Sequence, residues 1–174
     1  MRKAIFLDRD GVINKIIIKN GLPFSPSSFA ELEILPGVKE SILKLQKLNF
    51  LCLVVTNQPD VSRGKIEKKT IIKMNNYLKD EIKLDDIFVC YHDDHDKCKC
   101  RKPKPGLLLD ASKKWDINLK KSYMIGDRWR DIEAGKSVGC KTIFIDYDYK
   151  EAKPKNPDFT TDSLLNAVHL IEKL

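Results

Sequence analysis

The amino-acid sequence predicts an α/β fold: a three-layer, Rossmann-like parallel sheet with helices on both faces and no large cap domain. Short apolar runs of strand length alternate along the chain with longer segments whose apolar residues recur at helical spacing. Strands that alternate with helices in this way form a parallel sheet between two helical layers. The 174 residues show no internal repeat or linker, so we expect one domain over residues 1–174.

Apolar runs of strand length predict the strands. They lie at residues 4–7, 51–55, 87–90, 123–125 and 141–145. Segments with one apolar face predict helices at about residues 36–48, 67–82, 105–115, 131–138 and 162–171. Pro36 and Gly37 suit the first turn of the first helix, and Asp162 is expected to N-cap the last one. The other segments are irregular, with a hairpin expected around residues 16–18.

Polar residues directly follow three of the predicted strands. Asp8, Thr56 and Asp127 each come just after an apolar run. Ligands of open α/β sheets bind outside the carboxyl ends of the strands, so these side chains are expected to meet on one rim. The sequence therefore predicts a functional site at that rim.

Composition and charge restrict the classes of partner. Hydrophobic residues make up 42% of the chain and charged residues 33%, a balance typical of globular proteins rather than disordered or membrane proteins. The net charge of +7 indicates either a lysine-rich solvated surface or attraction to an anionic partner, such as a phosphorylated metabolite. Basic residues do not alternate with aromatic ones in a stripe, so nucleic acid is not the expected partner.

The sequence does not predict a membrane protein. No apolar run approaches the roughly 20 residues that a membrane span needs. The N-terminus begins like a short signal peptide, but Asp8 interrupts its apolar run too early. We therefore expect a cytoplasmic protein, and its composition suggests a monomer.

The cysteines indicate metal binding rather than disulfides, because three of the five cluster in one short loop. Together with a histidine they provide four ligands suited to a tetrahedral structural Zn²⁺, namely Cys90, His92, Cys98 and Cys100. Free thiols are the alternative. His95 would be an alternate ligand, but its simpler interpretation is a solvated loop residue. The loop has little apolar material, so a metal would fix its shape and hold Lys102, which follows directly. Cys52 and Cys140 adjoin apolar runs and are expected in the core.

Two aspartates follow the first strand, in the run Asp8-Arg9-Asp10-Gly11-Val12. A carboxylate such as Asp8 can attack a phosphoryl group to form an aspartyl phosphate. A second carboxyl such as Asp10 can protonate the leaving group and then activate water. Such a site needs a cation, and Mg²⁺ binds carboxylates and phosphate together. Because loops and calcium sites use the same spacing, a structural turn remains an alternative.

Later segments supply the other groups that phosphoryl transfer needs: a hydroxyl with an amide, a fixed positive charge and acidic metal ligands. These are Thr56 with Asn57, Lys102, and Gly126-Asp127 with Asp131. In this order the four segments resemble the motifs of the haloacid dehalogenase superfamily of phosphatases, over essentially the whole chain.

The resemblance implies a role for each motif residue. Asp8 would be the nucleophile and Asp10 the general acid and base. Mg²⁺ would be bound by the Asp8 carboxylate, the Asp10 backbone carbonyl and Asp127, and Asp131 would orient the site from outside this ligand set. The short chain is similar to the capless form of the family, in which residues 14–28 and the Cys/His loop would line the pocket.

The Cys/His loop with its following Arg-Lys-Pro narrows the resemblance to two groups, the heptose 1,7-bisphosphate 7-phosphatases and the histidinol-phosphate phosphatases. The Arg63-Gly64 pair looks like the heptose group, whereas the short loop between His92 and Cys98 looks like the histidinol group. We favour removal of the 7-phosphate of D-glycero-D-manno-heptose 1,7-bisphosphate. That reaction would supply nucleotide-heptose precursors of lipopolysaccharide or another surface glycan.

Polar side chains near the motifs are candidate substrate contacts by the same resemblance. They are Asn57, Gln58, Arg63, Arg101 and Arg128. Arg63 and Arg128 have a simpler interpretation as surface arginines. Arg101 adjoins both Lys102 and the Cys/His loop, and its guanidinium would suit a second phosphate through paired hydrogen bonds.

Three rival classes remain. A nucleic-acid 3′-phosphatase would use the basic charge, and steep salt dependence of its affinity would reveal it. A non-enzymatic phospho-acceptor domain would keep its aspartyl phosphate for many minutes, but Asp10 supplies the base that removes it. A third class is a protein-interaction module organised by zinc. Such a module would not explain why Asp8, Lys102 and Asp127 are expected to converge.

Overall fold

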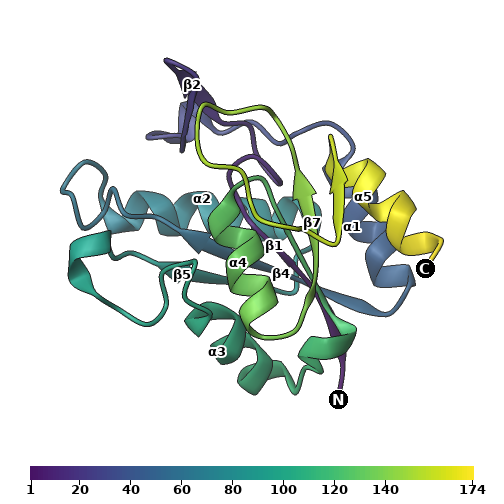
Figure 1. Ribbon diagram of the computed structural model, residues 1–174. Helices are drawn as coiled ribbons and strands as arrows, with labels where there is room; N and C mark the ends of the chain where they lie inside the picture. Colours follow the sequence, from purple (N-terminus) through teal and green to yellow (C-terminus); the bar gives the residue numbers. More distant parts are fainter.

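One parallel sheet organises the chain, and the computed structural model describes all of residues 1–174 (Figure 1). Its strands lie in the order β5 (Asp86–Cys90), β4 (Phe50–Asn57), β1 (Lys3–Leu7), β6 (Tyr123–Gly126), β7 (Lys141–Ile145) and β8 (Phe159–Thr161). Every neighbouring pair in this sheet is parallel. The chain passes from β1 to one side through β4 and β5, then returns to the other side through β6. The strand order therefore reverses beside β1, where ligands bind in such sheets.

The central strands are buried on both faces, which explains why their sequences are apolar without alternation. Leu7 of β1 pairs with Val54 of β4 on one side and with Ile125 of β6 on the other. Because β6 ends only one residue beyond the partner of Leu7, Asp8 and Asp127 both emerge at the carboxyl edge of the sheet. The sequence-predicted rim is thus present in the fold.

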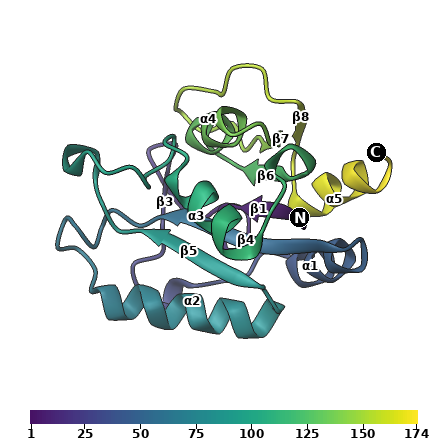
Figure 2. The same ribbon diagram turned by 90° about the horizontal axis from the view of Figure 1, so that it is seen from below.

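Helices cover both faces of the sheet, and Figure 2 shows the strands lengthwise with the helices around them. One face carries α1 (Val38–Lys47), α2 (Lys68–Ile82) and α5 (Leu164–Glu172), whose apolar sides join one core cluster. The other face carries α3 (Gly106–Trp115) and α4 (Trp129–Ser137), which share a second core cluster. The predicted three-layer α/β fold is therefore confirmed. The helices are all too short or too polar to cross a bilayer.

The segment between β1 and α1 contains only a small hairpin and one 3-10 turn, which agrees with the expected absence of a large cap. The hairpin pairs β2 (Ile17–Lys19) with β3 (Leu22–Phe24), close to its predicted position. The loop after β7 runs beside it (Figure 1), and the Lys150 backbone N–H donates to the Gly21 carbonyl at 2.9 Å. That 3-10 turn is η1 (Phe29–Glu31), and two others lie later in the chain, η2 (Asp94–Asp96) and η3 (Leu119–Lys121).

Three details differ from the sequence prediction. Helix α1 begins at Val38 rather than at Pro36, because Gly37 has a left-handed backbone (φ +76°) and stands as the N-cap. The N-cap of α5 is Ser163 rather than Asp162, because Ser163 Oγ accepts the backbone N–H of Asn166. Asp162 instead accepts hydrogen bonds from the Ser163 hydroxyl and the Asn166 side chain. Strand β8 was not predicted, because its three residues are only partly buried and carry no apolar run. Cys52 and Cys140 are buried in the core, as expected.

Candidate active site

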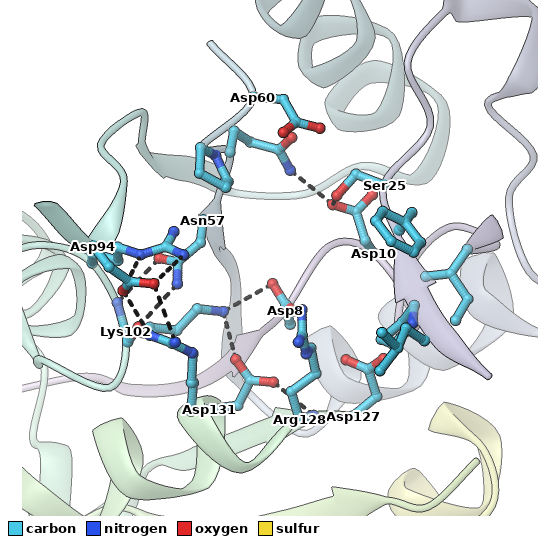
Figure 3. A pocket seen from close by; sticks show the side chains of 18 of the residues that line it. Asp8, Asp10, Ser25, Asn57, Asp60, Asp94, Lys102, Asp127, Arg128 and Asp131 are labelled. Atoms are coloured by element: carbon cyan, nitrogen blue, oxygen red, sulfur yellow. Dashed lines mark hydrogen bonds and ion pairs between the residues drawn. The ribbon is translucent and has the colours of Figure 1, made fainter. Parts of the chain in front are cut away.

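A cavity of about 300 Å³ opens at the carboxyl ends of β1, β4 and β6 (Figure 3). Its lining is mostly polar or charged and includes Asp8 and Asp127 from the strand ends. Leu22 and Phe24 of the hairpin contribute to an apolar wall. Thr56 does not line the cavity and is fully buried at the end of β4. The fold therefore brings two of the three predicted rim residues to the cavity itself.

Lys102 is a buried ammonium held between two carboxylates (Figure 3). Its Nζ lies 2.8 Å from Asp8 Oδ1, 2.6 Å from Asp131 Oδ1 and 2.6 Å from the Val55 carbonyl oxygen. These three partners match the three N–H bonds of an ammonium, so the charge has a fixed position. Burial alone would lower the pKa of Lys102, but the charges of Asp131 and Asp8 outweigh burial and raise that pKa. Lys102 is therefore a permanent cation at the base of the cavity.

The two oxygens of Asp8 have different surroundings. Oδ1 accepts hydrogen bonds from Lys102 Nζ and, at 2.8 Å, from the backbone N–H of Arg9. Oδ2 accepts no hydrogen bond from the protein, although Asp8 lines the cavity. Burial raises the pKa of Asp8 to about 6, against the lowering effect of Lys102. The arrangement holds the carboxylate by one oxygen and leaves the other available.

Asp8, Asp127 and Asp131 each offer an oxygen within 4.8 Å of the others. Their three negative charges meet the one positive charge of Lys102, which leaves two negative charges. Asp127 Oδ2 accepts the Tyr149 hydroxyl at 2.8 Å, while Asp127 Oδ1 is buried without a partner. Burial, then Asp8, then Asp131 raise the pKa of Asp127 well above its usual range. A divalent cation would satisfy the orphaned oxygen and the surplus charge, so the donor set fits Mg²⁺.

Two glycines make this packing of carboxylates possible. A Cβ at Gly11, which has φ +88°, would come within 2.1 Å of Asp127 Oδ2. A Cβ at Gly126 would lie 2.2 Å from the Asp131 Cβ. Gly11, which follows Asp10, thus leaves space for the Asp127 carboxylate, and Gly126, which precedes Asp127, leaves space for Asp131.

Asp10 is held in a dense set of hydrogen bonds. Its carboxylate accepts from Arg9 at 3.0 Å, Asn14 Nδ2 at 2.9 Å, Ser25 Oγ at 2.8 Å and Gln58 Nε2 at 2.8 Å. Arg9 is completely buried. Burial would raise the pKa of Asp10, but the Arg9 charge and the hydrogen bonds lower it below its usual range. Asp10 therefore rests as a carboxylate at the edge of the cavity.

Asn57 and Gln58 line the cavity, but both bond to protein groups. Asn57 Nδ2 donates to the Lys102 carbonyl and Asn57 Oδ1 accepts the Lys102 backbone N–H, both at 3.1 Å. Gln58 Nε2 donates to Asp10 and, at 2.9 Å, to Thr56 Oγ1. Asn57 thus anchors the backbone of Lys102 to β4, and Gln58 orients Asp10.

The Cys/His loop brings its four ligand atoms together. The sulfur of Cys90 lies 3.1 Å from that of Cys100 and 3.7 Å from that of Cys98, and His92 Nδ1 lies 3.3 Å from the Cys100 sulfur. Tetrahedral zinc, with Zn–S bonds of about 2.3 Å, would place its sulfurs roughly 3.8 Å apart. The residues therefore fit a Zn²⁺ ion. His95 is exposed and contacts Asp93 and Asp96 instead.

All three sequence-predicted arginines line the cavity, and each is paired with an acid. Arg63 forms two hydrogen bonds to Asp93, at 2.6 and 2.8 Å. Arg101 Nε donates to Asp94 at 2.9 Å. Arg128 forms a two-pronged ion pair with Glu151.

Several residues of this cavity were missed by sequence reasoning. Arg130 lines it and bonds to Asp94 at 3.0 Å, although only Arg128 was predicted from that segment. Ser25 lines the cavity and donates to Asp10, and it lies within residues 14–28, which were expected to line the pocket. Tyr149 was not predicted; it lies beside the cavity and donates to Asp127. The position of Arg130, next to the motif residue Asp131, was the only signal in the sequence. Tyr149 carried none, because its contact with Asp127 depends on the tertiary fold.

Comparisons with known proteins agree with this geometry. Residues 99–167 match the model of a family described as HAD-hydrolase-like. A D-glycero-β-D-manno-heptose-1,7-bisphosphate 7-phosphatase of Helicobacter pylori is 37% identical over 149 residues, which cover 82% of this chain and 83% of that protein. The chain belongs to the HAD-like phosphatases. It is therefore an enzyme that hydrolyses phosphoric monoesters, and the family resemblance drawn from its motifs is confirmed.

Other HAD-like phosphatases extend the similarity over the whole chain. The Escherichia coli D-glycero-β-D-manno-heptose-1,7-bisphosphate 7-phosphatase is 32% identical and covers 98% of this chain and 94% of its own. A Campylobacter jejuni relative, 34% identical over 82% of this chain and 81% of its own, is named for the α anomer. A crystal structure of the B. bronchiseptica D,D-heptose 1,7-bisphosphate phosphatase with magnesium and phosphate superposes with a TM-score of 0.85. It is 26% identical and covers 98% of both chains.

Proposed function

We propose that this protein removes the 7-phosphate of D-glycero-D-manno-heptose 1,7-bisphosphate through an aspartyl phosphate formed on Asp8. The observation that carries the mechanism is the asymmetric setting of Asp8. Lys102 and the Arg9 N–H hold Oδ1, while Oδ2 is left unbonded in an acidic cavity. The names of the similar enzymes support the substrate.

The cation site is proposed from the chain's own donors. Asp8, Asp127 and the Asp10 backbone carbonyl would hold Mg²⁺, and it is the unpartnered Asp127 Oδ1 that supports this set. Asp131 would act from outside it, since its two oxygens are engaged by Lys102 and the Arg128 backbone N–H. When bound, Mg²⁺ offsets the charge of the carboxylates and of the phosphoryl group.

In the first half-reaction, Asp8 Oδ2 attacks phosphorus and the bond from phosphorus to the sugar oxygen breaks. The leaving alkoxide takes a proton from Asp10, which must be protonated in the substrate complex although it rests as a carboxylate in the free enzyme. Lys102 stays beside Asp8 and balances the developing negative charge. Thr56 is proposed to act indirectly, because its buried hydroxyl accepts from Gln58, which in turn orients Asp10. Asn57, which lines the cavity, would reach the phosphoryl oxygens only by exchanging its bond to the Lys102 carbonyl.

In the second half-reaction, Asp10 takes a proton from water, and the resulting hydroxide attacks the aspartyl phosphate. The phosphorus–oxygen bond to Asp8 breaks, phosphate leaves, and Asp10 is protonated for the next cycle. The hydrogen bonds from Arg9, Asn14, Ser25 and Gln58 favour the carboxylate form of Asp10, which suits this base role.

Zn²⁺ is proposed as a structural ion held by Cys90, His92, Cys98 and Cys100, with all four positions filled by the protein. Lys102 lies two residues beyond the last ligand. The ion would therefore fix the segment that carries the buried ammonium.

The substrate's second phosphate would meet the arginine-rich side of the cavity, where Arg63, Arg101 and Arg128 are the proposed contacts. The relatives include both anomer specificities, so both anomers are substrates to compare. We place the reaction in the cytoplasm, on a monomeric enzyme, in the supply of nucleotide-heptose for lipopolysaccharide or another surface glycan.

A screen of phosphorylated metabolites with Mg²⁺ tests this function. It should include both heptose 1,7-bisphosphate anomers, histidinol phosphate and a 3′-phosphorylated oligonucleotide. We expect the highest kcat/KM for a heptose bisphosphate, with the 1-phosphate retained in the product. A higher kcat/KM for histidinol phosphate or for the oligonucleotide would overturn the substrate assignment and leave the phosphatase mechanism in place.

A further inference from the structure

Arginines from three separate segments meet at one side of the cavity. Arg63 comes from the loop after β4, Arg101 from the Cys/His loop and Arg130 from the first turn of α4. A cluster of guanidinium groups beside a phosphatase centre would be a strong anion site if the groups were free. They are not free, because each one bonds to a carboxylate.

The carboxylates come mainly from the Cys/His loop. Asp94 Oδ1 accepts from Arg101 Nε at 2.9 Å and from Arg130 NH1 at 3.0 Å, so one side chain bridges two arginines (Figure 3). Asp93 and Asp60 pair with Arg63. Three guanidinium groups thus face three carboxylates, and their formal charges cancel. An arriving anion meets a neutral cluster and must displace an acid to gain charge.

Asp94 and Asp93 differ in how firmly they are held. Asp93 has a side chain only 15% exposed, and it also accepts the Asp94 backbone N–H as the cap of η2. The Asp94 side chain is 58% exposed and bonds to nothing but the two arginines. Asp94 can therefore swing into solvent without opening the loop, whereas Asp93 cannot.

The geometry points to Asp94 as a specificity-determining residue that occupies the place of an anion between Arg101 and Arg130. The non-reacting phosphate of a bisphosphorylated substrate would displace it and take over both guanidinium groups. This inference rests on the proposed function and adds that the Asp94 carboxylate competes with the second phosphate for Arg101 and Arg130. In the free enzyme Asp94 keeps the two arginines in position, and it makes singly charged or small anions poor ligands there.

Kinetics on a matched pair of substrates tests the inference. D-glycero-D-manno-heptose 1,7-bisphosphate and heptose 7-phosphate share the reacting phosphate and differ only in the second one. An exposed carboxylate–guanidinium pair changes an equilibrium constant a few-fold. The Asp94→Asn variant loses two such pairs, which the second phosphate would otherwise have to break. The KM for the bisphosphate should therefore fall roughly fivefold to tenfold. The KM for heptose 7-phosphate should change less than about twofold on the same grounds.

Further variants separate displacement of Asp94 from a structural effect. Asp94→Glu keeps the charge and should keep the higher KM. Asp110→Asn removes an exposed carboxylate of α3 outside the cavity, and should leave both KM values unchanged. Removing Arg130 in Arg130→Ala should raise the KM for the bisphosphate and shrink the effect of Asp94→Asn, because the two residues interact directly.

The outcomes distinguish this inference from the proposed function. A wild-type enzyme that does not prefer the bisphosphate to heptose 7-phosphate would overturn both. A wild-type enzyme that prefers the bisphosphate, with the ratio of the two KM values unchanged in Asp94→Asn, would overturn the role of Asp94 alone. Equal changes in both KM values would also contradict displacement by the second phosphate.

Discussion

Replacement of Lys102 by methionine tests the charge balance of the site. The substitution removes a buried ammonium that contacts Asp8 at 2.8 Å and Asp131 at 2.6 Å, while it keeps much of the side-chain volume. Breaking a buried ion pair on one side typically costs about 3–5 kcal/mol, because the remaining charge stays buried without a partner. For a chain of this size, each kcal/mol lowers Tm by about 2–4 °C. We therefore expect Lys102→Met to lower Tm by roughly 6–20 °C.

The assay is thermal and urea unfolding followed by circular dichroism, in buffer without Mg²⁺ and without a chelator that would strip zinc. Lys113→Met is the matched control, because Lys113 is an exposed lysine of α3, and it should change the free energy of unfolding by less than about 0.5 kcal/mol. Added Mg²⁺ should restore part of the lost stability. The same loss in both variants, or no response of Lys102→Met to Mg²⁺, would refute the reasoning.

Further expectations concern the metal sites and the partly buried Asp86. Elemental analysis of freshly purified protein should give about one zinc per chain. The zinc content should be lower in Cys98→Ser. Zinc-free protein with full activity would contradict the structural role of the ion. Tyr149→Phe removes the hydroxyl that donates to Asp127 Oδ2. Mg²⁺ binding, measured by calorimetry, should become several-fold weaker. An unchanged dissociation constant would show that Tyr149 does not position this carboxylate. Asp86 is partly desolvated, which would raise its pKa, but hydrogen bonds from Lys114 and Trp115 outweigh this and lower the pKa. A depressed folded-state pKa gives stability that is present above the unfolded value of about 3.9 and lost as pH falls below it. The free energy of unfolding of Asp86→Asn should therefore fall less steeply than that of wild type between pH 5 and pH 3, and parallel curves would contradict this contribution.

The sequence was sufficient for the sheet and for the ends of its central strands. β1, β4 and β6 are buried, so their apolar runs were clear, and each run stopped where the rim begins. β8 was missed because an edge strand of three residues needs no apolar run. The N-cap of α5 was misplaced by one residue, since Asp162 and Ser163 are both good capping residues and only the backbone geometry selects Ser163.

The candidate site was predicted where its residues follow strands and missed where they meet across loops. Asp8, Lys102, Asp127 and Asp131 come together as the motif order implied. The bridge from Asp94 to Arg130 joins residues 36 positions apart, and no local pattern indicates it. Arg9 also resisted prediction, because arginine is rarely fully buried and its pairing with Asp10 is needed to explain it.

Trapping the intermediate tests the central claim most directly. The enzyme would be quenched during turnover of the heptose bisphosphate and treated with borohydride, which reduces an aspartyl phosphate to homoserine, and the modified peptide would be located by mass spectrometry. We expect homoserine at position 8 in the wild-type enzyme, and none in a folded Asp8→Asn variant that has lost turnover. Modification at another aspartate, or an Asp8→Asn variant with undiminished turnover, would contradict the assignment of Asp8 as the nucleophile.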